Sequence, residues 1–131
     1  MVSIDTITAT VKEFMIEEPR IIAVYLLGSA GRESMRANSD IDLAIMIDPK
    51  TKIPPLERMK LANNLSYALA RTVDLGEISS KNLIYTAEAF FTGRCIYTKN
   101  KDVADLYRAS LLGMYVQFNY DRREIMNAYQ Y

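Results

Sequence analysis

Apolar residues recur along the chain with two different spacings, which predict helices alternating with strands. Near the start, an apolar stripe follows helical spacing: Ile4, Ile7, Val11, Phe14 and Met15. Ser3 or Asp5 can cap the start of this helix, and Pro19 lies just beyond its end. A continuous apolar run, Ile21–Leu27, follows, and a second apolar run, Ile41–Ile47, is interrupted only by Asp42. Runs of this kind are typical of buried central strands.

The second half of the chain repeats this alternation. We expect a helix over Pro55–Arg71, a strand over Thr72–Ile78 and a short strand over Arg94–Thr98. Between the last two, Ser80 can cap a helix that stops at Gly93 and buries five residues: Leu83, Ile84, Ala87, Phe90 and Phe91. A short helix over Ala30–Met35 is expected between the two apolar runs. The pattern predicts one α/β domain over residues 1–131, without repeats or linkers.

A long amphipathic helix is expected from about Lys101 to the end of the chain. One face carries seven apolar or aromatic residues in helical register: Val103, Leu106, Tyr107, Leu111, Met114, Tyr115 and Phe118. We expect most of these residues, and the tail from Ile125 to Tyr131, to pack on the same domain. The alternative is that this helix and its tail form a docking surface for a partner.

The amino-acid composition limits which ligands, catalytic groups and metal ligands the protein can use. Sixteen basic residues balance sixteen acidic ones, which argues against broad nucleic-acid binding because that requires an excess of basic surface. Histidine is absent, so Ser-His triads, histidine bases and histidine metal ligands are excluded. Any metal must be held by oxygen ligands, which favours Mg²⁺, with Mn²⁺ as an alternative.

Cellular location is predicted from the cysteine count and from hydropathy. The single cysteine, Cys95, excludes an internal disulfide and fits a reducing compartment. It lies in a short apolar run, so we expect a buried structural thiol rather than a nucleophile. No targeting segment is visible, and the longest apolar run is far too short to span a membrane. We therefore expect a cytoplasmic protein.

The most specific motif joins the two apolar runs. Gly28-Ser29 ends the first run, and after ten residues Asp40-Ile41-Asp42 opens the second. Small residues let a backbone approach phosphate closely, and a helix N-terminus offers free N–H groups to anions. Two acids spaced i, i+2 on a strand point the same way. Together these are the parts of a metal-assisted phosphoryl or nucleotidyl transfer site.

Asp74 is a third candidate acid, because it interrupts an otherwise apolar strand. Asp40 and Asp42 would repel each other by roughly 4 kcal/mol at about 4 Å and an effective dielectric of about 20, which a divalent cation relieves. If the strand of Asp74 lies beside that of Asp42, three acids could hold two metal ions. One ion would bind the phosphates and the other would activate the attacking hydroxyl.

Each of these features taken alone has a structural alternative. The Gly-Ser pair can simply mark a turn, the Asp-x-Asp pair can be solvated or act as a cap, and Asp74 can face water from an edge strand. Arg32 either pairs with Glu33 on the surface or contacts phosphate. Ser39 can orient the Asp40 loop through hydrogen bonds to the backbone. The combination is more specific than any single element.

These residues resemble a known family. Gly28-Ser29, Arg32, Ser39-Asp40-Ile41-Asp42-Leu43 and Asp74 are similar to the signature of the minimal nucleotidyltransferases, the MNT branch of the DNA polymerase β-like superfamily. The resemblance implies a small mixed β-sheet flanked by helices, ATP as donor and Mg²⁺ as metal, with two ions. It implies nucleotide binding by Gly28, Ser29, Arg32 and Ser39. It implies metal binding and catalysis by Asp40, Asp42 and Asp74, the last helping to deprotonate the acceptor.

The chain departs from the family pattern at one position. Glu33 follows Arg32, where the family usually has glycine, so a side chain and a negative charge enter near the phosphate turn. We expect this difference to affect the rate of nucleotidyl transfer more than the fold.

Short proteins of this type resemble the antitoxin of HEPN/MNT toxin–antitoxin pairs. The resemblance implies transfer of AMP from ATP to a tyrosine hydroxyl of a helical HEPN ribonuclease toxin, which then forms a hetero-oligomer with this chain. One alternative is an antitoxin that masks its toxin by contact, with a weak catalytic site. Another is a nucleotidyltransferase acting on RNA or a small molecule, against which the neutral charge balance counts.

Overall fold

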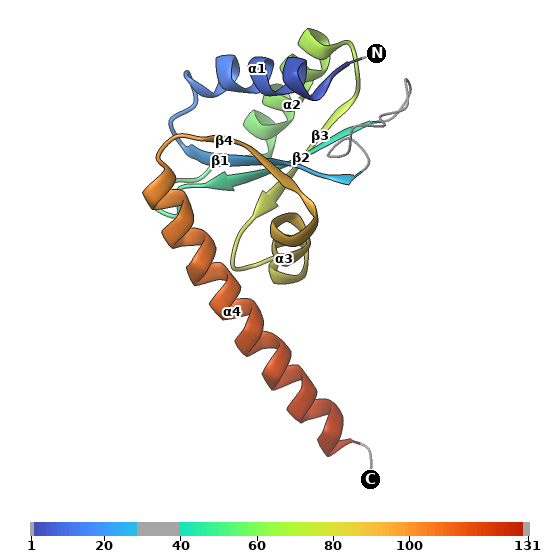
Figure 1. Ribbon diagram of the computed structural model, residues 1–131, viewed down its shortest axis with the longest axis vertical. Coiled ribbons are helices and arrows are strands. Elements are labelled where there is room, and N and C mark those ends of the chain that lie inside the picture. Colours follow the sequence, from blue (N-terminus) through green and yellow to red (C-terminus); the bar gives the residue numbers. More distant parts are fainter. Residues whose placement is uncertain (1, 29–39, 130–131) are drawn as a thin grey trace.

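A computed structural model describes residues 2–28 and 40–129 (Figure 1). Four helices and four strands alternate along these residues almost as the hydrophobic pattern predicts. In chain order they are α1 Ile4–Met15, β1 Ile21–Leu26, β2 Ile41–Ile47, α2 Pro55–Leu69, β3 Val73–Ile78, α3 Leu83–Thr92, β4 Arg94–Thr98 and α4 Lys101–Ala128. The expected helix over Ala30–Met35 lies outside the described residues.

The strands form one mixed sheet in the order β3-β2-β1-β4. β1 pairs antiparallel with both β2 and β4, whereas β2 and β3 run parallel. Helices α1 and α2 cover one face, and α3 with the first part of α4 covers the other (Figure 1). The prediction of a small mixed sheet between helices is therefore confirmed.

The two central strands are buried on both faces, which explains their continuous apolar sequences. Successive side chains of β2 point to opposite faces, so Ile41, Leu43 and Ile45 pack toward α1 and α2. Ala44 and Met46 pack toward α3 and α4. By the same alternation Asp42 belongs to the α3 face, but it is the second residue of the strand and is exposed.

The ends of the helices agree with the sequence in part. Ser3 caps α1, because its side chain accepts a hydrogen bond from the Thr6 backbone N–H at 3.1 Å. Gly93 ends α3 as expected, but the N-cap of that helix is Asn82 rather than Ser80. The predicted buried face of α3 was also partly wrong, since Ile84 and Phe91 are 56% and 67% exposed.

The long C-terminal helix begins where it was expected, but most of it does not pack on the domain. Only Ala104 and Leu111 of α4 are buried, because the helix then runs past the sheet (Figure 1). The remaining expected core positions include four exposed side chains: Val103, Leu106, Met114 and Phe118. The prediction that the tail packs on the domain was wrong for its described part, since residues 125–129 are exposed. No helix within residues 2–28 and 40–129 combines the length and apolarity needed to cross a membrane.

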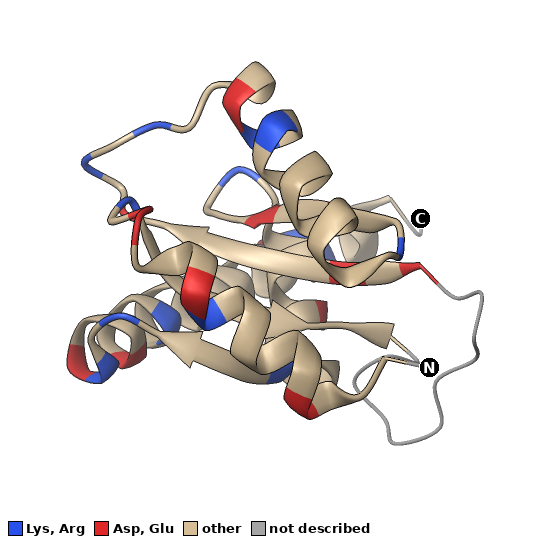
Figure 2. Cartoon of the chain, turned by 90° about the horizontal axis from the view of Figure 1, so that it is seen from above, with Lys and Arg blue, Asp and Glu red and all other residues tan. Residues whose placement is uncertain are grey.

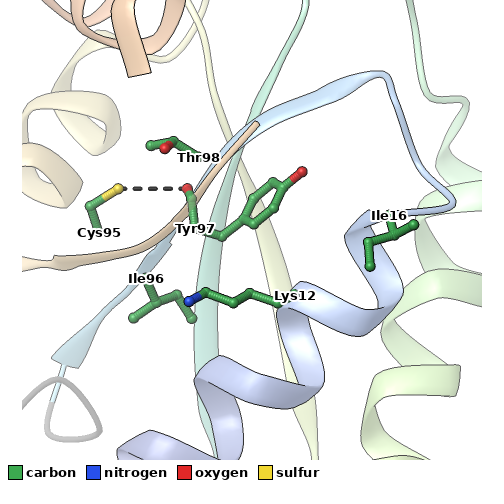
Figure 3. A pocket seen from close by; sticks show the side chains of 6 residues that line it. All are labelled: Lys12, Ile16, Cys95, Ile96, Tyr97 and Thr98. Atoms are coloured by element: carbon green, nitrogen blue, oxygen red, sulfur yellow. Dashed lines mark hydrogen bonds between the residues drawn. The ribbon is translucent and has the colours of Figure 1, made fainter. Parts of the chain in front are cut away.

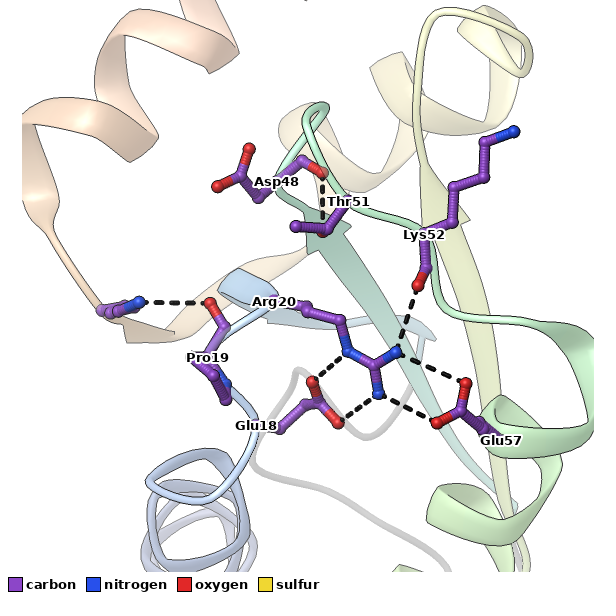
Figure 4. A network of polar contacts seen from close by, with 8 residues as sticks. Glu18, Pro19, Arg20, Asp48, Thr51, Lys52 and Glu57 are labelled. Atoms are coloured by element: carbon purple, nitrogen blue, oxygen red, sulfur yellow. Dashed lines mark hydrogen bonds and ion pairs between the residues drawn. The ribbon is translucent and has the colours of Figure 1, made fainter.

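An arginine-centred network ties the start of β1 to α2 (Figure 4). The Arg20 guanidinium donates hydrogen bonds to both carboxylate oxygens of Glu18, at 2.7 and 2.9 Å. It also reaches Glu57 at 3.4 Å and the Lys52 carbonyl oxygen at 3.1 Å. These bonds hold the loop before α2 against the start of β1, at the end of the sheet opposite to Asp42.

Glu18→Gln is expected to lower the free energy of unfolding by about 1 kcal/mol at neutral pH, because it removes a charge-assisted, bidentate contact. The hydrogen bonds from Arg20 hold the pKa of Glu18 below its usual 4.5. The stabilisation is therefore complete above pH 4.5 and is lost as the pH falls through the lowered pKa. Urea titrations at pH 7 and pH 3 check this, with Glu17→Gln as the exposed control. A difference from wild type that grows at pH 3 would contradict it.

Candidate functional site

The candidate site lies where the first residues of β2 and β3 pair with each other. These strands run parallel, and their register places Asp42 directly beside Asp74. The prediction that the third acid lies on a strand next to the second is therefore confirmed. Asp40 lies one residue before β2 and is close enough to act electrostatically on Asp42. Two neighbouring acids, Asp40 and Asp42, and the distant Asp74 thus gather at one end of the sheet.

The turn after β1 comes to the same place. The Leu27 backbone N–H donates a hydrogen bond to the Asp42 carbonyl oxygen at 2.9 Å, which fixes the end of β1 beside the start of β2. Gly28 has φ +65°, a left-handed conformation that glycine adopts at no steric cost. A Cβ added to Gly28 would lie 3.9 Å from Asp42 Oδ2. The glycine of the turn and the carboxylate are therefore neighbours.

A cavity of about 350 Å³ opens at this point, and Asp42 and Asp74 form part of its wall. Its lining residues are Leu27, Gly28, Asp42, Asp74, Leu75, Gly76, Tyr85 and Glu88. An acidic stretch is visible where β2 begins beside the grey trace (Figure 2). The turn, the acid pair and one side of α3 thus enclose a single hollow.

The electrostatics of Asp42 show that like charges converge here. Although Asp42 is exposed, partial desolvation of its carboxylate is the main cause of its raised pKa, and the negative charges of Asp74 and then Asp40 add to it. A divalent cation relieves such a clash, and carboxylate oxygens are the ligands that Mg²⁺ prefers. The donor set therefore fits a hard metal ion. Within the described residues, however, no three acidic or sulfur side chains converge as a ready-made metal cluster.

Three of the nucleotide-binding residues implied by the resemblance, Ser29, Arg32 and Ser39, lie outside the described residues, as does Glu33. Their roles stay predictions. Sequence reasoning missed Gly76, Tyr85 and Glu88, which line the cavity. The available signal was Gly76, because a glycine inside a strand often marks close approach by another group.

A second hollow lies on the far edge strand β4, against α1 (Figure 3). It contains Cys95, which is exposed, so the prediction of a buried thiol was wrong. The reason is that the outer residues of an edge strand have no further strand or helix to cover them. The Cys95 thiol donates a weak hydrogen bond to the Tyr97 carbonyl oxygen at 3.6 Å. Partial desolvation raises the pKa of this thiol, which disfavours the nucleophilic thiolate.

A protein-family model matches most of the chain. Residues 9–102 match the family model described as Polymerase beta, Nucleotidyltransferase. The match includes β1, β2 and β3, and therefore every acid of the candidate site.

A curated relative is the protein adenylyltransferase MntA of Shewanella oneidensis, 26% identical over 109 residues. The alignment covers 83% of this chain and 76% of MntA.

Solved structures reproduce the fold. A toxin–antitoxin crystal structure with AMP-PNP contains a chain that is 23% identical, with a TM-score of 0.76. That alignment covers 92% of this chain and 96% of the other. The complex of a tri-AMPylated Shewanella oneidensis HEPN toxin with its MNT antitoxin gives 20% identity and a TM-score of 0.74. It covers 95% of this chain and 96% of the other.

Proposed function

The chain belongs to the polymerase beta nucleotidyltransferase family, and from this premise we propose that it is an antitoxin that AMPylates its toxin. The reaction moves AMP from ATP to a tyrosine hydroxyl of a cognate HEPN-type ribonuclease toxin and silences it. The observation that carries this proposal is that Asp42 and Asp74 are paired residues on neighbouring strands and line one cavity together with Gly28. The single cysteine fits a reducing cytoplasm as the place of action.

The chemistry follows from the residues around the cavity. The acceptor oxygen forms a bond to the α-phosphorus, the bond to pyrophosphate breaks, and the proton of the acceptor passes to Asp74. Gly28 leaves room for phosphate oxygens because it has no side chain. Asp40, Asp42 and Asp74 would hold Mg²⁺, which would neutralise phosphate charge when bound. Catalysis is then largely positioning and charge neutralisation.

The acceptor and partner are inferred from the relatives. MntA is called a protein adenylyltransferase, and one similar solved complex contains an AMPylated HEPN toxin with its MNT antitoxin. The balance of sixteen basic and sixteen acidic residues counts against RNA as the acceptor, because broad nucleic-acid binding requires an excess of basic surface.

The distal part of α4 supplies a surface for that partner. Beyond Leu111 the helix carries exposed apolar or aromatic side chains that the domain does not cover: Met114, Val116, Phe118, Tyr120, Ile125, Met126 and Tyr129. Apolar side chains gathered on a protruding element mark a protein contact site. We call these residues the α4 surface and assign it to the toxin.

A second candidate function is an antitoxin that masks the toxin by contact alone. The α4 surface favours it equally, since binding through this helix needs no chemistry. The two functions differ in whether the acids at the cavity are used.

Incubation of the purified chain with Mg²⁺, α-labelled ATP and the HEPN-type protein encoded beside it is expected to label that protein. Loss of its ribonuclease activity should follow the label. The labelled residue should be a tyrosine by mass spectrometry. Inhibition in a stoichiometric complex, with no label, would replace the enzyme by the masking antitoxin.

A further inference from the structure

The side chain of Tyr85 lies against Gly76 of β3 in the lining of the cavity. This side chain comes from α3, and a Cβ added to Gly76 would fall 1.9 Å from the Tyr85 hydroxyl oxygen. Gly76 follows Asp74 by two residues on the same strand face, beside Ala44 of β2. Small residues on both strands therefore make room for the phenol ring near the acids.

The Tyr85 hydroxyl is held as a neutral hydrogen-bond donor. Burial, followed by the negative charges of Asp42 and Glu88, raises the pKa of Tyr85 to about 12. The hydroxyl has no hydrogen-bond partner among the described residues, although it belongs to the wall of the cavity. A donor that keeps its proton is thus left free beside the acid pair.

The register of the strands separates two ends of the cavity. At the first end Gly28, a turn glycine, is suited to the phosphates of the nucleotide. At the second end, farther along β3 than Asp74, lie Gly76 and the ring of Tyr85. A nucleotide held at the first end leaves the second end for the group that attacks it, because attacking and leaving oxygens lie on opposite sides of phosphorus.

We propose that Tyr85, seated on Gly76, forms the acceptor subsite and takes an aromatic hydroxyl, the side chain of a tyrosine. This assignment rests on the proposed function and identifies the part of the site that recognises the acceptor. The ring of Tyr85 packs against the acceptor ring. The Tyr85 hydroxyl donates a hydrogen bond to the acceptor oxygen as that oxygen loses its proton to Asp74. Glu88 at the rim disfavours acceptors that carry phosphate.

Tyr85→Phe keeps the ring and removes only the hydrogen-bond donor. We expect kcat/KM for the HEPN-type toxin to fall about five- to tenfold, through the KM for the toxin or through kcat, with the KM for ATP unchanged. Tyr67→Phe is the matched control, because Tyr67 is 91% exposed on α2. A change confined to the KM for ATP, or activity equal to wild type, would overturn the assignment.

Gly76→Ala provides a second test, because its methyl group displaces the Tyr85 hydroxyl. Its kcat/KM for the toxin should fall further than that of Tyr85→Phe, while ATP binding by calorimetry stays near wild type and the melting temperature falls by a few degrees because the phenol ring must shift. Equal kcat/KM for Gly76→Ala and wild type would refute the subsite. Absence of label with the wild-type chain would instead refute the proposed function, so the two failures are distinguishable.

Discussion

Asp42→Asn is expected to reduce transfer of label from ATP to the toxin to less than about one-hundredth of the wild-type rate. The amide keeps the shape of the side chain but removes the charge that would hold a divalent cation. Asp40→Asn and Asp74→Asn should give the same loss, because the charges of both acids act on Asp42 and all three acids are proposed to hold the cation. Single-turnover assays with α-labelled ATP at saturating Mg²⁺ measure the effect.

The same variant is expected to melt at a higher temperature than wild type. Burial and the neighbouring carboxylates raise the pKa of Asp42, so the folded state disfavours its ionised form. At neutral pH the wild type carries this cost and Asp42→Asn does not. As the pH falls through the raised pKa, Asp42 becomes protonated and the difference in stability shrinks. Thermal melts without metal, at pH 7 and pH 4, check the sign.

A matched control distinguishes the loss of a carboxylate at the site from the loss of any exposed negative charge. Asp5→Asn removes an exposed carboxylate from α1, on the opposite face of the sheet. It should leave transfer unchanged. Full activity in Asp42→Asn, with Asp5→Asn also active, would remove the acids from the mechanism.

The strands and the acid cluster were predictable because short-range rules determine them. A central strand has a continuous apolar sequence, and Ile21–Leu26 and Ile41–Ile47 have no other way to bury their side chains. The alternation of side chains then aligned the acids of the second strand. The position of Asp74 needed one further assumption, that the third strand pairs with the second, and the sheet order confirms it.

The errors arose where burial depends on what the rest of the chain covers. Periodicity identified α3 and α4 as helices, but it cannot tell which apolar face meets the sheet. Phe91 is exposed, although it contacts the ring of Tyr115 at 6.3 Å between centroids. Cys95 lies in an apolar stretch of sequence, but it is exposed because its strand is at the edge of the sheet. Tyr85 was missed because its approach to Gly76 joins two elements and leaves little trace in the sequence.

The geometry of α4 leads to a separation of binding from catalysis. The helix has 28 residues, roughly 42 Å at 1.5 Å per residue, and its last buried residue is Leu111. An isolated helical end is marginally stable in water, so exposed apolar residues along it are better explained by a partner than by helix stability. The acids, in contrast, belong to the sheet.

Truncation after Glu124, which removes Ile125–Tyr131, is therefore expected to weaken toxin binding at least about tenfold and to leave ATP binding unchanged. Ile125→Glu combined with Met126→Glu should do the same without shortening the chain, because both side chains are more than half exposed and charges are unfavourable in an apolar contact. Ala109→Glu, an exposed position on the proximal part of α4, is the matched control. Calorimetric titration with the toxin and with ATP measures both affinities.

The comparison between truncation and Asp42→Asn then distinguishes the two candidate functions. An enzyme that acts by turnover still labels the toxin after truncation when the toxin is supplied above the weakened Kd, because the acids are intact. A masking antitoxin loses inhibition in proportion to the binding that it loses. Asp42→Asn leaves the inhibition by such an antitoxin unchanged. Co-purification of the toxin with the truncated chain at wild-type yield would contradict the assignment of the α4 surface and would place the contact elsewhere on the domain.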